Sequence, residues 1–115
     1  TTGVTDVSAL AGCATLHTLD LSCCEGVTDV SALANCEAMH TLNLSSCISV
    51  AEVSALGRCA ALHALNLRCT SIIDVSALGG RCAALHSLNV SYCGLTDVSS
   101  LVGCAALHTL DLSFC

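Results

Sequence analysis

The stretch Leu16–Cys24, with the sequence LHTLDLSCC, decides the fold of this 115-residue chain. Within it, Leu19 and Leu21 flank one polar residue, which is the period-two pattern of a short β-strand with one buried and one solvated face. The nine-residue pattern begins again at Met39, Leu62, Leu85 and Leu107. Five copies in register predict five equivalent strands.

A second sequence motif precedes each strand pattern. It reads VTDVSAL at Val4–Leu10 and recurs at Val27–Leu33, Val50–Leu56, Ile72–Leu78 and Leu95–Leu101. We place the repeats at about 4–26, 27–49, 50–71, 72–94 and 95–115, within a single array. A fixed period of this size predicts a solenoid. Every strand runs the same way, so the strands should be parallel, about 4.8 Å apart, in one concave sheet.

The return segment of each repeat carries one acidic residue. These are Asp6, Asp29, Glu52, Asp74 and Asp97. We expect each to be the N-cap of a 3₁₀ or short helical turn, with the carboxylate of Asp6 accepting from the backbone N–H of Ser8 or Ala9. A calcium ladder is the alternative, but calcium takes six to eight oxygens and each turn offers one carboxylate.

The strand pattern L-x-x-L-x-L-x-x-[N/C] resembles that of leucine-rich repeats, over nearly the whole chain. The wording of Leu19–Leu33 is similar to the cysteine-containing repeats of F-box proteins, and closer still to leucine-rich-repeat proteins of trypanosomatid parasites. The resemblance implies an α/β solenoid with a concave parallel sheet of five strands and 3₁₀ or short helical turns on the convex side. It also implies protein binding at the concave face.

Composition excludes several classes of protein. Apolar residues make up 54% of the chain and charged residues 10%, against about 25% charged in ordinary domains, which argues against disorder. A net charge of −6 argues against nucleic acid as a partner. The longest run without a charged residue, Cys82–Thr96, is shorter than the roughly 18 residues of a membrane span.

Eleven cysteines, nine of them in two repeating columns, raise disulfide and metal hypotheses. The first column is Cys13, Cys36, Cys59, Cys82 and Cys104; the second is Cys24, Cys47, Thr70, Cys93 and Cys115. A disulfide scaffold is one interpretation, but the cysteine number is odd and the opening residues from Thr1 do not resemble the charged and apolar segments of a secretory leader. We predict free thiols, buried as small hydrophobes, in a reducing intracellular compartment such as the cytoplasm.

The Cys-x-x-x-His pairs are a poor zinc site. Zinc ligands converge on one point, whereas these columns place like residues along a line. Identical Cys and His residues in five copies cannot mark one specialised catalytic centre either, and no phosphate loop or Ser-His-Asp set is present. We therefore predict no enzymatic activity, no metal and no cofactor.

One histidine stands before each strand. His17, His40, His63, His86 and His108 are 23, 23, 23 and 22 residues apart. They should form a partly exposed stack at one border of the sheet. A structural role is one interpretation; the other is a pH-responsive ladder, because neighbouring imidazolium charges about 5 Å apart repel each other.

The concave face should present three lanes of small side chains. The lanes are Thr18, Thr41, Ala64, Ser87 and Thr109; Asp20, Asn43, Asn66, Asn89 and Asp111; and Ser22, Ser45, Arg68, Ser91 and Ser113, with Tyr92 and Phe114 near the rim. Arg and Tyr are typical of binding hot spots. We predict a protein-interaction scaffold whose partner contacts these lanes. The alternative is that the lanes are only the solvated surface of the sheet and bind no partner.

Two alternative functions remain open. One is a structural spacer, or a self-assembling repeat segment, of a cytoskeletal or surface assembly; the other is the substrate-receptor array of an F-box-type ubiquitin ligase. Neither end of the chain carries a polar cap, and Leu107, Leu110 and Leu112 should form an apolar end rung. We therefore expect a segment of a longer array, or end-to-end stacking on copies or neighbours.

Overall fold

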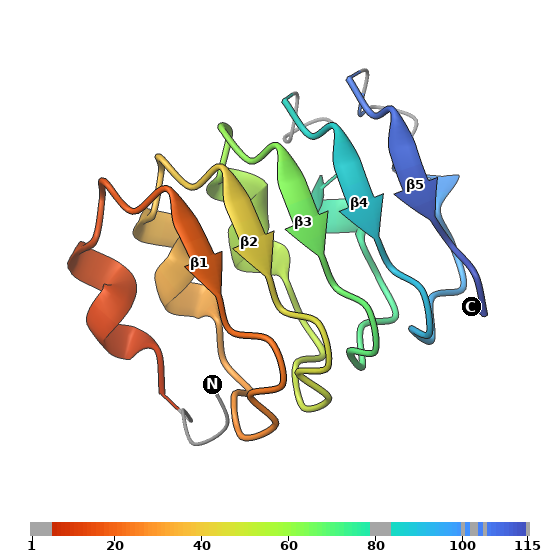
Figure 1. The fold of residues 1–115 in the computed structure, drawn as a ribbon, viewed down its shortest axis with the longest axis horizontal. Coiled ribbons are helices and arrows are strands. Elements are labelled where there is room, and N and C mark those ends of the chain that lie inside the picture. Colours follow the sequence, from red (N-terminus) through yellow and green to blue (C-terminus); the bar gives the residue numbers. More distant parts are fainter. Residues whose placement is uncertain (1–5, 79–83, 100, 102–103, 105, 115) are drawn as a thin grey trace.

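Five short strands form one parallel sheet. The computed structural model describes residues 6–78, 84–99, 101, 104 and 106–114. The strands are β1 (Thr18–Asp20), β2 (Thr41–Asn43), β3 (Ala64–Asn66), β4 (Ser87–Asn89) and β5 (Thr109–Asp111). They lie in the order β1-β2-β3-β4-β5, each parallel to its neighbour (Figure 1). The predicted sheet is thereby confirmed.

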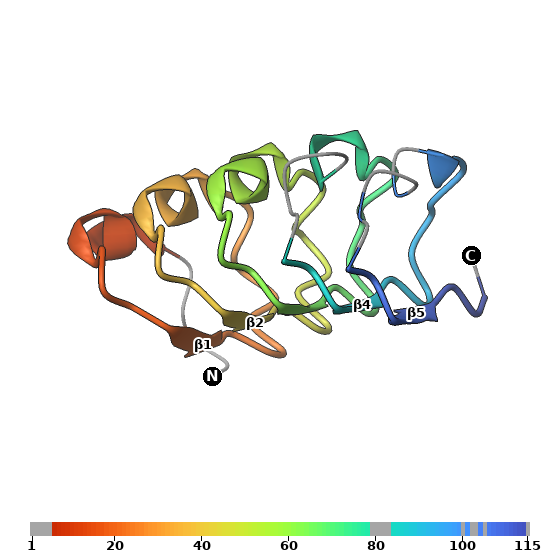
Figure 2. The same ribbon diagram turned by 90° about the horizontal axis from the view of Figure 1, so that it is seen from above.

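The opposite side of the solenoid is built from 3₁₀ turns. They are η1 (Ser8–Gly12), η2 (Ser31–Asn35), η3 (Ser54–Arg58) and η4 (Ser76–Leu78). Figure 2 shows the strands along one side of the molecule and these turns along the other. A period of about 23 residues leaves room for one or two tight turns on the convex side, which is why no full α-helix forms there.

We call Asp6, Asp29, Glu52, Asp74 and Asp97 the carboxylate column. The prediction that these residues are the N-caps is wrong by one residue in the first three turns, where the N-caps are valines and Asp6, Asp29 and Glu52 directly precede them. The predicted bond is nevertheless present, because Asp6 Oδ1 accepts from the Ser8 N–H at 2.8 Å, and the other three aspartates do the same in their repeats. Glu52, which is longer by one methylene, accepts from the Ser54 hydroxyl instead.

Leucines in register across the strands form the core. Leu42, Leu65 and Leu88 pair along the sheet and are 1–3% exposed. The equivalent Leu110 on β5 is 39% exposed, because β5 has a strand on only one side among the described residues. Each inner rung is therefore shielded by the rungs on both sides of it, as expected of a repeat array.

The backbone ladder continues past the strands into a left-handed turn. The Cys23 N–H donates to the Ser45 carbonyl at 2.8 Å, and the pattern recurs in the next three rungs. The four donors, Cys23, Ser46, Cys69 and Tyr92, have φ between 58° and 62°, and the equivalent Phe114 has φ 60°. None is glycine, and the left-handed conformation costs roughly 1–2 kcal/mol for a residue with a Cβ. Inter-rung hydrogen bonds hold the four donors in this conformation.

Candidate functional site

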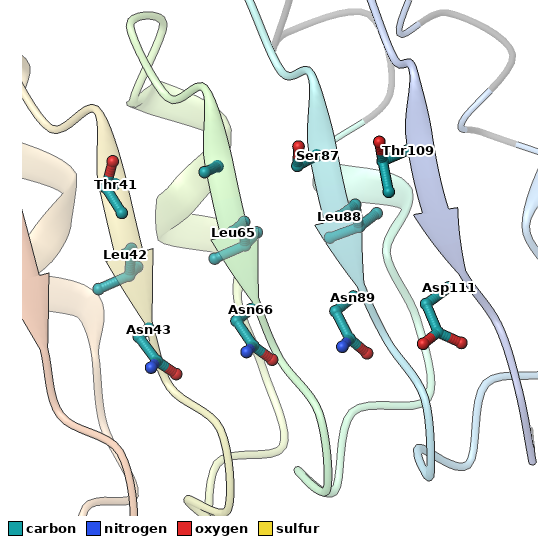
Figure 3. A pocket seen from close by; sticks show the side chains of 11 residues that line it. Thr41, Leu42, Asn43, Leu65, Asn66, Ser87, Leu88, Asn89, Thr109 and Asp111 are labelled. Carbon is teal, nitrogen blue, oxygen red and sulfur yellow. The ribbon is translucent and has the colours of Figure 1, made fainter.

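A shallow groove of about 410 Å³ runs along the concave face. Side chains from β2 to β5 line it, and Figure 3 shows them in parallel rows. The buried leucines Leu42, Leu65 and Leu88 lie between a hydroxyl row and an amide row. The groove crosses the strands rather than following one of them, so a ligand lying in it would contact several rungs at once.

The amide row is fixed in orientation. Asn43 Oδ1 accepts from the Ser45 N–H at 2.9 Å, and Asn66 and Asn89 hold the Arg68 and Ser91 N–H groups in the same way. A backbone N–H requires an acceptor, which places the oxygen on this side and leaves each Nδ2 as a donor for a ligand. Three amide donors in register can hydrogen-bond carbonyl or carboxylate oxygens.

The same row ends in a carboxylate on each side. Backbone and hydroxyl hydrogen bonds from Ser22 lower the pKa of Asp20. Asp111 has its pKa lowered by the hydroxyl and N–H of Ser113 and, to a smaller extent, by the nearby charge of Arg68. Both carboxyl groups are therefore ionised at neutral pH, and the row reads negative, neutral, neutral, neutral, negative.

The predicted histidine stack is confirmed, and it adjoins the hydroxyl row. We call His17, His40, His63, His86 and His108 the histidine ladder; successive ring centroids are 4.7, 4.7, 4.9 and 5.0 Å apart and the rings are parallel within 8°. In three rungs Nδ1 lies 3.0–3.3 Å from the hydroxyl of the following residue. Burial, followed by repulsion from His63 and His17, lowers the pKa of His40.

One residue of the third lane is not where the sequence placed it. Ser91 was expected on the exposed face, but it is fully buried. Its hydroxyl turns back to donate to Asn89 Oδ1 at 2.7 Å instead of reaching solvent. The equivalent Ser22 and Ser45 are half-buried, and Ser113 is exposed.

Arg68, Tyr92 and Phe114 form what we call the aromatic cluster at the rim of the groove. The Arg68 guanidinium carbon lies 4.6 Å from the centre of the Tyr92 ring. The Tyr92 and Phe114 rings stack at 4.6 Å with an interplanar angle of 16°. Tyr92 is 45% exposed and Phe114 74% exposed. A cation stacked on an exposed aromatic pair offers both apolar area and hydrogen-bond donors to a partner.

Sequence reasoning missed two parts of this surface. The groove is lined by Leu42, Leu65 and Leu88 as well as by the polar lanes. The left-handed column that carries Tyr92 and Phe114 was also missed, because the usual signal for such a column is glycine or asparagine and neither occurs in it. The contact of Arg68 with an aromatic ring one rung away could not be predicted from the repeat pattern either.

The two cysteine columns connect successive rungs. In the first column, the thiols of Cys36, Cys59 and Cys104 donate to carbonyls 26 residues earlier at 3.4–3.5 Å. In the second, Cys47 and Cys93 donate to the carbonyls of Leu21 and Leu67 at 3.0 Å. The columns are therefore more than small apolar filler, since they also satisfy backbone acceptors between rungs.

The described cysteines form no disulfide with one another. Cys82 and Cys115, which complete the two predicted columns, lie outside the described residues. Burial raises the pKa of the Cys36, Cys47 and Cys59 thiols, so these groups are poor nucleophiles. Cys23 is exposed and Cys69 half-buried.

Within the described residues, no group of three or more His, Cys, Asp or Glu side chains is arranged to hold a metal ion. No helix in that part of the chain is long and apolar enough to cross a membrane.

The geometry defines a class of fold, the leucine-rich-repeat solenoid. A family model described as "Leucine Rich repeat" matches residues 12–34 and 81–99. No match was found among curated proteins.

Solved structures of similar fold come from a bacterium and from plants. An internalin (inlF) from Listeria monocytogenes is 29% identical with a TM-score of 0.83, over 92% of this chain and 31% of that one. The plant peptide hormone receptor RGFR1, in complex with RGF2, is 18% identical with a TM-score of 0.58, over 93% and 22%. The ectodomain of the Arabidopsis thaliana receptor kinase GASSHO1/SCHENGEN3, in complex with CASPARIAN STRIP INTEGRITY FACTOR 2, is 21% identical with a TM-score of 0.60, over 94% and 17%. The chain thus spans a third or less of the length of each of these relatives.

Proposed function

We propose that this chain is a protein-interaction scaffold whose concave face binds a protein or peptide partner. The observation that carries the proposal is the aromatic cluster beside the groove. The only Tyr and the only Phe of the chain stack together, and Arg68 stacks on the tyrosine. Aromatic and arginine side chains dominate binding energy at protein interfaces. Two receptors of the same fold were solved with partners bound.

In this proposal the groove and the aromatic cluster have different tasks. The amide donors of Asn43, Asn66 and Asn89 suit the carbonyl oxygens of an extended chain laid across the strands. The aromatic cluster supplies the anchor beside the groove. No catalytic, metal or cofactor role is proposed for any of these groups.

The test is affinity capture with a matched pair of arginine variants. Arg68→Gln removes the cation of the aromatic cluster, whereas Arg58→Gln removes an exposed arginine at the end of η3, on the convex side. Partners captured by the wild-type chain should be lost with Arg68→Gln and with Tyr92→Ala, and retained with Arg58→Gln. Equal capture by all variants would refute binding through the aromatic cluster.

A structural spacer is the second candidate, and the small hydroxyl and amide side chains that dominate the lanes favour it. A spacer would be indifferent to all three substitutions. The finer sequence resemblances, to trypanosomatid proteins and to F-box substrate receptors, have no counterpart among the relatives above and remain predictions. So do the repeat boundaries, stacking of end rungs and a reducing intracellular compartment.

A further inference from the structure

Two columns of ionisable side chains, the histidine ladder and the carboxylate column, border the rungs and take no part in the proposed concave site. The histidine ladder lies at the amino ends of the strands. The first four residues of the carboxylate column each lie two residues before the first residue of a 3₁₀ turn, η1 to η4. Each column has one residue per rung, so the two borders carry matching numbers of groups that can take opposite charge.

The ladder presents one free edge to its surroundings. Nδ1 of His17, His40 and His86 faces the hydroxyl of the following residue, which directs Nε2 on the far side of the ring away from the strand. The rings are exposed in the end rungs and half-buried between them. Protonation would turn this edge into a row of cationic N–H donors about 5 Å apart.

Few other charges face the ladder. The groups that act on the charge of His40 are its neighbours His17 and His63. Three carboxylates are each three residues from a ladder histidine: the exposed Glu37 precedes His40, and Asp20 and Asp111 follow His17 and His108 at the opposite ends of β1 and β5. Within the part of the chain that the structure describes, the ladder thus has no row of carboxylates that matches it rung for rung, and we expect its full charging to draw on an external one.

The carboxylate column has the complementary geometry. Each aspartate accepts a backbone N–H from the serine two residues later at Oδ1, and for Asp6, Asp29 and Asp97 the hydroxyl of that serine also donates to the carboxylate. These carboxylates lie on exposed residues, so a partner can approach them from solvent. The same bonds lower the pKa of Asp6, Asp29 and Asp97, so these groups stay ionised in acid. Between η2 and η3 a hollow of about 230 Å³ has Asp29 and Glu52 in its wall, where the edge of an imidazolium ring can approach two carboxylates.

We propose that in mild acid the histidine ladder of one copy docks against the carboxylate column of a second copy. The two surfaces differ, so the contact is head-to-tail and can repeat from copy to copy. The concave face stays open throughout, and the inference is independent of the proposed function. Docking needs protonated imidazoles together with ionised carboxylates, and the ordinary pKa values of about 6.5 for histidine and about 4 for aspartate place that combination in mild acid. The lowered pKa values of His40 and of Asp6, Asp29 and Asp97 move both limits of this range downward.

Docking and protonation are linked in this arrangement. Mutual repulsion opposes charging of the isolated ladder, whereas carboxylates from a second copy relieve it. Association therefore takes up protons. Its equilibrium constant should rise up to tenfold for each pH unit by which the solution is acidified, for each proton bound. Exposed ion pairs are individually weak and are screened by salt, so docking should disappear at about 1 M NaCl, where the Debye length is about 3 Å.

Sedimentation velocity of two complementary variants tests the proposal. The ladder variant carries His40→Gln, His63→Gln and His86→Gln; the column variant carries Asp29→Asn, Glu52→Gln and Asp74→Asn. Asparagine preserves the bond to the serine N–H, and circular dichroism checks both folds. At pH 5.5 wild type should associate and at pH 7.5 it should be monomeric. Each variant alone should stay monomeric at pH 5.5, and an equimolar mixture should form heterodimers, because the column variant supplies the ladder and the ladder variant the column.

The mixture separates docking from non-specific association near the isoelectric point of about 4.9. Association of either variant alone to the wild-type extent would overturn the proposal, and so would a monomeric mixture of folded variants. If a triple variant does not fold, the single substitutions His63→Gln and Glu52→Gln should each weaken wild-type association severalfold, and unchanged association would count equally against docking. Binding of an oligoglutamate peptide by a chain that stays monomeric would assign the ladder to another acidic partner and overturn the proposal.

Discussion

Removing the thiol of Cys59 should destabilise the solenoid by about 1–2 kcal/mol. Cys59 is fully buried and donates to the Leu33 carbonyl at 3.4 Å. Loss of a neutral hydrogen bond costs about 0.5–1.5 kcal/mol, with a thiol at the low end, and loss of a buried group the size of a methylene about 0.8 kcal/mol. For a chain of this length, Cys59→Ala should lower Tm by roughly 4–8 °C.

Cys59→Ser should be worse than Cys59→Ala. The C–O bond is shorter than the C–S bond, so the hydroxyl would fall short of the Leu33 carbonyl, which the thiol already reaches only at 3.4 Å. An unsatisfied buried hydroxyl costs about 1–3 kcal/mol. Urea unfolding followed by circular dichroism measures both variants against Cys23→Ala, which changes an exposed thiol and should shift stability by less than about 0.5 kcal/mol. Equal stability of Cys59→Ala and Cys23→Ala would refute a structural role for the thiol.

Three further predictions concern acid, thiol chemistry and the core. Tm should be constant between about pH 6.5 and 7.5 and fall below that range, because a pKa lowered by folding, as for His40, makes the unfolded chain take up more protons; a flat Tm between about pH 7.5 and 5.5 would refute this. Ellman's reagent should react with Cys23 and Cys69 in the native protein and with at least about eight thiols after denaturation, whereas immediate reaction of every thiol would show that the core is open. Leu65→Ala should cost about 2–5 kcal/mol in urea unfolding and Leu110→Ala much less, and equal losses would contradict shielding by neighbouring rungs.

The features predicted from sequence are those that repeat. The aliphatic pair Leu19 and Leu21 recurs in every copy, with Val90 replacing the second leucine once, so its period gives strand direction, register and the buried face without any tertiary information. The histidine stack follows from the same logic, because identical residues at identical positions of parallel strands must lie one above another. In-register pairing turns a sequence period into a spatial one.

The features that escaped prediction depend on side-chain reach. The cap was misplaced by one residue because an aspartate bond to the N–H two residues later is compatible with either position, and only the backbone angles of Val7 decide. Ser91 was expected to be exposed because its lane alternates outward, but a hydroxyl can fold back onto its own strand. The contact of Arg68 with Tyr92 depends on rotamers that no period encodes.

Departures from the repeat are what can give this surface specificity. A ladder of identical side chains offers the same chemistry at every rung, so it can bind a periodic partner but cannot fix a register. Apart from Asp20 and Asp111, which end the amide row alike on both sides, four residues of the concave face and its rim depart from their columns: Ala64 among hydroxyls, Arg68 among serines, and Tyr92 and Phe114 in the left-handed column. All four lie between β3 and the C-terminal side of β5, and three of them stack together. A partner that contacts these four residues would occupy that half of the face. The histidine ladder and the carboxylate column on the two borders would remain available for contacts whose strength depends on the number of rungs engaged.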